Sequence, residues 1–140
     1  MLILASGKTI GEERRYPPGG NGMSCIEGLL NEVCRDVERE LKPAATGILT
    51  GWLVKVYLPQ DWIFKTEAES VTFHVTKTGS ATVKAGESTN PDVVIEWDHD
   101  SLSTVLKTRS SAGISHPPKV SVLTTKGKTG YDQLRKRIGI

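Results

Sequence analysis

The final fifty residues constrain the fold most, because they read in succession as a strand, a helix, a second strand and a second helix. Val93, Ile95 and Trp97 alternate with the residues that follow them, at positions 94, 96 and 98. This is the period-two pattern of a strand with one buried face. Asp98 or Asp100 then supplies the side-chain oxygen that caps the start of a helix. The segment therefore predicts a compact α+β unit.

The remaining elements of this segment follow from the same spacing rules. Their apolar positions are Leu102, Val105 and Leu106 in the first helix, Val120 and Val122 in the second strand, and Tyr131, Leu134 and Ile138 in the last helix. A glycine turn around Gly127 separates the second strand from the last helix.

Upstream, a long amphipathic helix is expected to begin at Ser24. Ser24 and Glu27 have the spacing of a capping box, and Pro43 is expected to end the helix. At 100° per residue, one arc of about 120° holds the apolar side chains. Its members are Ile26, Leu29, Leu30, Val33, Val37 and Leu41.

Three alternating runs between this helix and the final segment predict strands at 52–58, 71–75 and 81–85. The link 58–70 is expected to extend the first hairpin or to insert a turn into the core. Five strands and three helices with apolar stripes predict an α+β fold, in which a mainly antiparallel sheet carries the helices on one face. We expect a single domain over residues 23–140, preceded by an N-terminal arm over 1–22.

Composition narrows the location and the partners. A net charge of +2 with 24% charged residues gives no reason to expect nucleic acid as a partner. Cys25 and Cys34 would lie roughly 13 Å apart along one helix, too far for a disulfide, which needs Cα atoms within about 7 Å. Unpaired thiols favour a reducing compartment, so a cytoplasmic protein is expected.

Residues with catalytic or metal-binding chemistry are scattered. The cluster Glu96–Asp100 divides between a strand face and a turn, so it is interpreted as a strand end and a helix cap rather than a metal site. His74 and His116 have no nucleophile partner in a recognisable motif. We therefore expect no catalysis, no metal and no cofactor.

The stretch Lys126–Gly130 resembles the end of a phosphate-binding loop, but Val122 stands where such a loop needs its first glycine. A weaker interpretation survives, in which Lys126 and Lys128 at the start of the last helix hold an anionic head group. The alternative is a plain glycine turn followed by a solvated basic helix end.

The strand–helix–strand–helix pattern of the final fifty residues, with its strand leading through a glycine turn into a C-terminal helix, resembles the second half of a sterol carrier protein type-2 domain. That resemblance implies a lipid cavity between the sheet and the helices, covered by the last helix. The side chains it assigns to lipid binding are Leu30, Val33, Val37, Trp52, Val54, Val56, Phe73, Leu102, Leu106, Tyr131 and Leu134. Periodicity alone does not distinguish this cavity from a filled core.

The leading hypothesis is non-catalytic binding or transfer of a hydrophobic ligand, such as a fatty acyl, isoprenoid or sterol-like lipid. An anionic membrane surface or an acyl-CoA would be its further partner. The alternative from another class is an interaction or regulatory subunit with a filled core that self-associates, as a homodimer for example, or binds a protein. A third hypothesis is an accessory domain that holds a coenzyme A thioester through Lys126 and Lys128.

Overall fold

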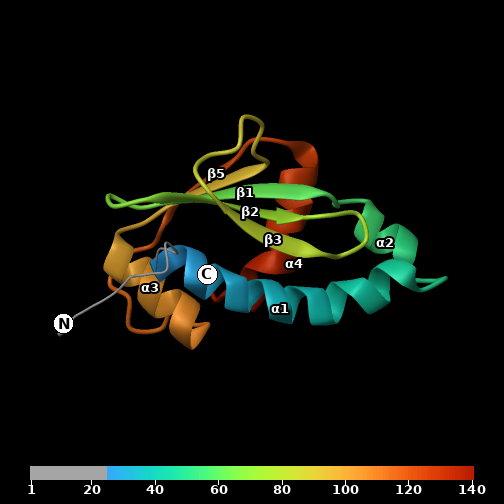
Figure 1. Cartoon of the computed structure of the whole chain (residues 1–140), viewed down its shortest axis with the longest axis horizontal. Coiled ribbons are helices and arrows are strands. Elements are labelled where there is room, and N and C mark those ends of the chain that lie inside the picture. Colours follow the sequence, from blue (N-terminus) through green and yellow to red (C-terminus); the bar gives the residue numbers. More distant parts are fainter. Residues whose placement is uncertain (1–24) are drawn as a thin grey trace, which may run out of the picture.

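The computed structural model describes residues 25–140 as one α+β unit (Figure 1). Its elements in chain order are α1 (Cys25–Thr46), α2 (Gly51–Lys55), β1 (Gln60–Lys65), β2 (Ser70–Val75), β3 (Ala81–Ala85), β4 (Val93–Glu96), α3 (His99–Thr108), β5 (Lys119–Val122) and α4 (Thr125–Ile138). The predicted arm over 1–22 and the capping residue Ser24 lie outside the described residues.

The five strands form one sheet in the order β3-β2-β1-β4-β5. Three neighbouring pairs are antiparallel, and the central pair of β1 with β4 is parallel. The prediction of a mainly antiparallel sheet is therefore confirmed, although the sheet is mixed at its centre.

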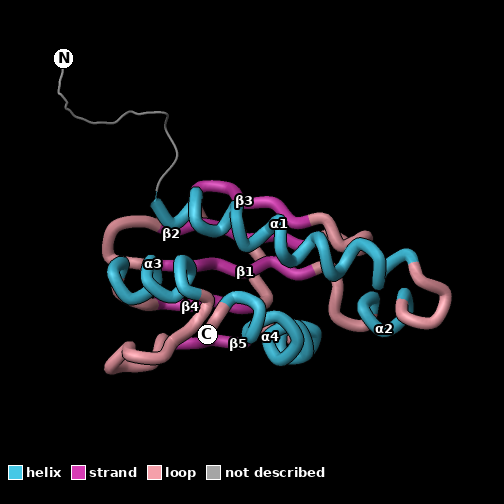
Figure 2. Tube along the Cα trace, turned by 90° about the horizontal axis from the view of Figure 1, so that it is seen from below, coloured by secondary structure: helices cyan, strands magenta, loops and turns pink. Residues whose placement is uncertain are grey.

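Helices α1 and α3 lie across one face of this sheet in Figure 2, and α4, seen end-on there, packs against β1, β4 and β5 and reaches α1 on the same side. The covered face carries large side chains of the central strands, with Trp62, Phe64 and Phe73 all fully buried. Trp62 and Phe73 meet edge to face with ring centroids 6.4 Å apart, the arrangement that aromatic pairs prefer. The predicted arrangement of helices on one face is confirmed.

The strand predicted at 52–58 is wrong, because this stretch forms the short helix α2 and the turn that follows it. Val54, Tyr57 and Leu58 are buried in this stretch, as is Gly51 just before it, so the buried positions have the spacing of one helical face. Because nearly every residue from 52 to 58 is apolar, the sequence also fitted the period-two pattern of a strand. The first strand of the sheet is β1, within the stretch that was expected to be a link.

The predicted end of α1 at Pro43 is also wrong, since the helix continues through this proline to Thr46. Proline removes one helical hydrogen bond, yet the apolar stripe of α1 extends past it through Leu41 and Ala45, both of which are buried. Packing of this last turn maintains the helix. The hydroxyl of Thr46 donates to the carbonyl of Lys42 at 3.1 Å.

Candidate functional site

Most of the side chains predicted to bind lipid form the hydrophobic core. Seven of them are buried in one cluster between the sheet and the helices: Leu30, Val33, Val37, Phe73, Leu102, Leu106 and Leu134. Tyr131 is partly buried and packs against that cluster. Their assignment to a ligand stays a prediction, and the structure places them against one another.

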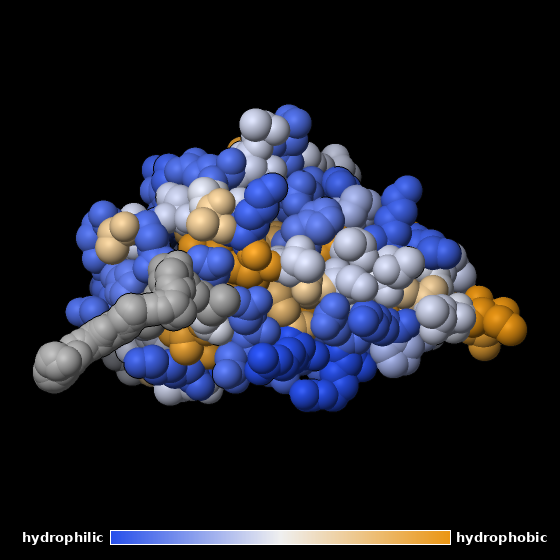
Figure 3. All heavy atoms as spheres, viewed as in Figure 1, coloured by the Kyte–Doolittle hydropathy of each residue, from blue (hydrophilic) through white to orange (hydrophobic). Residues whose placement is uncertain are grey.

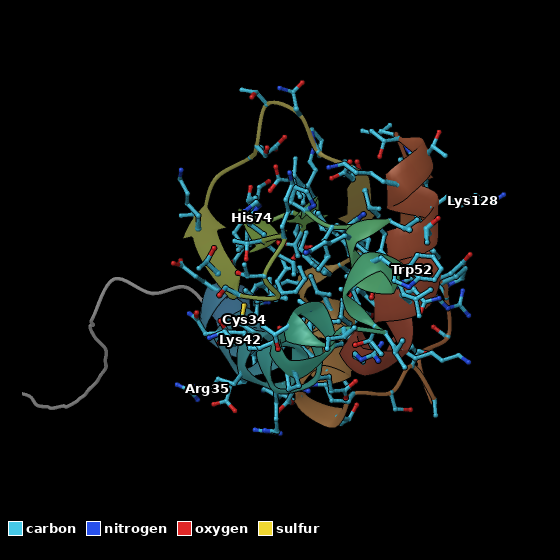
Figure 4. The ribbon with its side chains drawn as sticks, turned by 90° about the vertical axis from the view of Figure 1, so that its right-hand side faces the viewer. Cys34, Arg35, Lys42, Trp52, His74 and Lys128 are labelled. Carbon is cyan, nitrogen blue, oxygen red and sulfur yellow. The ribbon has the colours of Figure 1, made fainter. Side chains whose placement is uncertain are left out.

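The other three predicted residues lie on α2 or, for Val56, at its C-cap, and not on a strand. Val54 is buried, whereas Trp52 is 64% exposed and Val56 is 60% exposed. Figure 4 shows Trp52 on α2 at the end of the molecule that faces the viewer. The two outward-facing side chains therefore contribute to the surface of this end rather than to the interior.

A largely apolar groove of about 540 Å³ runs along this end, between the C-terminal half of α1, helix α2 and helix α4. We call it the α2 groove. Its apolar side chains are Leu41, Ala44, Leu53, Val54, Val56 and Tyr57, and its polar ones are Glu40, Thr50, Thr129, Gln133 and Arg137. Two of the predicted lipid-binding residues, Val54 and Val56, therefore line it.

The short turn between α1 and α2 positions the first wall of the groove. The hydroxyl of Thr50 donates to the carbonyl of Ala44 at 2.6 Å, and the amide of Gly51 donates to the carbonyl of Gly47 at 2.9 Å. A Cβ atom at Gly51 would stand only 3.0 Å from the carbonyl oxygen of Ala45. Glycine at this position lets α2 fold back closely on α1.

A buried glutamine connects α2, β1 and α4 beside the groove. The Nε2 atom of Gln60 donates to the carbonyls of Tyr57 at 2.5 Å and Lys126 at 2.7 Å. Its Oε1 atom accepts from the indole Nε1 of Trp62 at 2.8 Å. Because this amide is fully buried and each of these bonds joins a different segment, it fixes α4 relative to α2.

Charged groups form one rim of the groove. Arg137 of α4 forms an ion pair with Glu40 of α1 and also donates to the carbonyl of Gln133. Burial raises the pKa of the Tyr57 phenol, and the positive charge of Arg137 opposes that increase. The groove thus has an apolar floor and a polar side, on which Arg137 is paired with Glu40.

The two lysines predicted to bind an anionic head group differ in their surroundings. Lys126 donates to the carbonyl of Pro59 at 2.7 Å and lies 3.7 Å from a carboxylate oxygen of Asp92. Lys128 is exposed and points away from α4 in Figure 4. At the start of this helix the Thr124 hydroxyl already accepts from the amide of Gly127. The head-group role stays a prediction.

The acidic cluster caps a helix, as the sequence indicated. Asp98 is the N-cap of α3 and accepts from the amide of Ser101 at 2.9 Å. Hydrogen bonds from Ser101 lower the pKa of Asp98 to about 2, and a hydrogen bond with His116 contributes to this shift. The Nε2 atom of His116 lies 2.6 Å from Oδ1 of Asp98. Within the part of the chain that the structure describes, no three potential metal-ligating side chains come together.

A second, polar groove of about 480 Å³ lies on the sheet face opposite the helices. Here His74 of β2 contacts Asp61, its directly paired neighbour on β1. The rest of the lining comes from Thr72 of β2, from Thr82, Lys84 and Ala85 of β3, and from the loop 86–89. The sequence missed this histidine–carboxylate pair because the strand carrying Asp61 was interpreted as a link.

Sequence reasoning also missed most of the α2 groove. Gln133 and Tyr57 had no assigned role, Arg137 was interpreted only as part of the basic helix end, and Leu41 only as part of a helix stripe. Gly51, Val54 and Tyr57 have the spacing of a helix face, but the apolar residues between them conceal this repeat in the sequence.

No protein-family model matches this sequence, and no curated protein matches it. Among solved structures, a chain described as a UbiJ-SCP2 ubiquinone synthesis protein is similar over 77% of this chain and 92% of its own, with 8% identity and a TM-score of 0.42. A double mutant of the sec-alkyl sulfatase PisA1 is similar over 54% of this chain, with 13% identity and a TM-score of 0.41. This chain spans only 13% of the sulfatase. With TM-scores below 0.5 neither likeness bears on function, and membership of the sterol carrier family stays a prediction.

Proposed function

We propose that this protein binds the apolar chain of a hydrophobic ligand, of the fatty acyl or isoprenoid class, in the α2 groove, and that it does so as a binding protein without catalysis. The observation that carries the proposal is the groove itself, in which the apolar side chains of Leu53 and Val56 remain open to solvent beside α1 and α4. Its volume of about 540 Å³ is within the usual range of small-molecule sites.

Affinity in this proposal comes from burial of methylene groups. Leu53 and Val56 are 50% and 60% exposed, so a chain lying against them removes apolar surface of both partners from water. Each buried methylene contributes about 0.8 kcal/mol, or about a fourfold gain in affinity. Affinity should therefore rise with chain length until the groove is full.

Orientation comes from the polar side of the groove. Gln133 and Arg137 lie on α4 facing the apolar residues of α2 across the groove, with Thr129 one and two turns before them. A carboxylate or phosphate at the end of the ligand would compete with Glu40 for the guanidinium of Arg137. Anionic head groups should therefore bind better than neutral ones of equal chain length.

Displacement of a fluorescent fatty acid from the full-length protein tests the proposal. Ala44→Phe fills the groove with an aromatic ring and should weaken binding at least tenfold, about the loss of two methylene contacts. Ala112→Phe, in an exposed loop away from the groove, is the matched control and should bind as the unmodified protein does.

Two results would contradict the proposal. One is equal binding by both phenylalanine variants, which would place any ligand elsewhere. The other is no binding of acyl or isoprenoid probes by a protein that sedimentation shows to be a dimer dissociated by Ala44→Phe. That pair of findings would favour the alternative of a self-associating interaction subunit.

A further inference from the structure

The turn that joins α1 to α2 exposes more apolar surface than any ordinary loop requires. Ile48 is 96% exposed, Leu49 is 81% exposed and the neighbouring Trp52 is 64% exposed. In Figure 3 this end of the molecule is strongly hydrophobic and projects beyond the rest of the surface. Contiguous exposed apolar residues of this size mark contact with another phase or partner. We call Ile48, Leu49 and Trp52 the apolar tip.

The charged residues in the stretch that carries the tip are all basic. Between Glu40 and Asp61 the sequence contains Lys42 and Lys55 and no acidic residue. Both lysines are exposed, and Lys42 forms an ion pair with Glu38, in which Nζ lies 3.7 Å from Oε2. Lys128, exposed at the start of α4, adds a further cation beside the groove residue Thr129. An anionic surface complements this end, and each lysine close to anionic lipid strengthens attraction to it.

We infer that the apolar tip docks this protein on anionic lipid bilayers. A bilayer interface receives a protruding apolar turn without needing a complementary pocket, and an exposed tryptophan suits the boundary between head groups and acyl chains. The docking is peripheral, since no helix among residues 25–140 is long and apolar enough to cross a membrane.

Docking in this way places the α2 groove at the bilayer surface, because Trp52 lies next to Leu53, which lines that groove. The inference extends the proposed function but does not depend on it. A tip that inserts into a bilayer does so whether or not the groove holds a chain. The two proposals are separated by the variant Ala44→Phe, which changes the groove and leaves the tip intact.

Co-sedimentation of the full-length protein with vesicles tests the inference, using phosphatidylcholine alone and phosphatidylcholine mixed with phosphatidylglycerol. We expect stronger binding to the mixed vesicles, and we expect that binding to weaken as salt is raised. Leu49→Asp should reduce the partition coefficient by about tenfold or more, since it removes one inserted leucine and adds an anionic group. Lys55→Glu should reduce binding only to the anionic vesicles.

Leu123→Asp is the matched control, because Leu123 is also an exposed leucine, at 56%, but follows β5 rather than α1. It should bind vesicles as the unmodified protein does. The inference is overturned if the protein binds neither vesicle, or if Leu49→Asp and Leu123→Asp bind equally. It is also overturned if Leu49→Asp instead dissociates a dimer in solution, which would assign the tip to a second copy of the chain.

Discussion

Gly130 provides a sharp test of the arrangement around the groove, because two opposing effects act on its replacement by alanine. Alanine in the interior of a helix is favoured over glycine by about 1 kcal/mol. Here, however, an added Cβ would overlap the side-chain amide of Gln60. That amide is fully buried and makes three hydrogen bonds, so it has no free direction in which to move.

The structure therefore predicts a net loss of stability for Gly130→Ala. Overpacking costs about 1–3 kcal/mol, and displacement of the amide leaves buried partners unpaired at about 1–3 kcal/mol. After subtraction of the gain in helix propensity, the free energy of unfolding should fall by about 1–5 kcal/mol. Each kcal/mol of that loss lowers the Tm of a domain of this size by about 2–4 °C.

Urea unfolding of a double-mutant cycle with Gln60→Ala measures the clash directly. Without the amide, the new methyl group has space, so Gly130→Ala should become neutral or stabilising in that background. Gln60→Ala alone should be destabilising, because it leaves the indole N–H of Trp62 without its acceptor. A Gly130→Ala variant that is more stable than the unmodified protein, or a cycle without coupling, would refute this account of the contact between β1 and α4.

Three further predictions concern other parts of the fold. Gly79→Ala should lower the free energy of unfolding in urea by about 1–3 kcal/mol more than Gly86→Ala does. Both glycines have positive φ, but a Cβ at Gly79 would lie 2.6 Å from the α1 backbone, whereas Gly86 faces open space. Equal losses would contradict the close approach of α1. Asp98 has a lower pKa in the folded state than its ordinary value of 3.8. Its stabilising effect should therefore be full above pH 3.8 and should be lost as the pH falls towards about 2. The stability of Asp98→Asn should accordingly depend less on pH between these two values than that of the unmodified protein. Burial raises the pKa of the Cys34 thiol to about 12, so in a Cys25→Ser background iodoacetamide should label Cys34 only after unfolding, and rapid labelling of the native protein at neutral pH would show that the thiol is accessible.

The elements with clear periodicity could be predicted from the sequence. The strands at 71–75, 81–85 and 93–96 alternate because one face lies against the helices and the other does not, and the structure has strands at these positions. The last two helices show the spacing of a single buried stripe, and both are observed. Each of these elements has one buried face and one more exposed face, so its sequence shows a single clear periodicity.

The failures arose where burial was not one-sided. In β1, Trp62 and Phe64 face the helices, yet Ile63 on the opposite face is also buried, so no alternation marks this central strand. In α2 the reverse holds, since Leu53 and Val56 are apolar and exposed, so that both a helical and an alternating pattern fitted. Because this stretch was predicted to be a strand, Trp52 and Val56 were expected to face the interior, whereas both are exposed.

The candidate site was missed for a related reason. The α2 groove is formed by the consecutive helices α1 and α2 together with α4, which begins only at Thr125. Its shape depends on the turn after Thr46 and on the buried amide of Gln60. Neither the fold-back of α2 on α1 nor the hydrogen bond across sixty-six positions leaves a pattern in the sequence. The apolar residues could be recognised, but their exposure could not.

The central claim, that the α2 groove holds an apolar chain, is tested most directly by photo-crosslinking. A fatty acid with a diazirine near the end of its chain would be bound to the full-length protein and activated by light, and the labelled peptides would be mapped by mass spectrometry. The account predicts labels in 41–57 and 129–137, and their loss in Ala44→Phe. Labels confined to 71–75 and 102–106 would instead place the chain between the sheet and the helices, and would contradict the assignment to the groove.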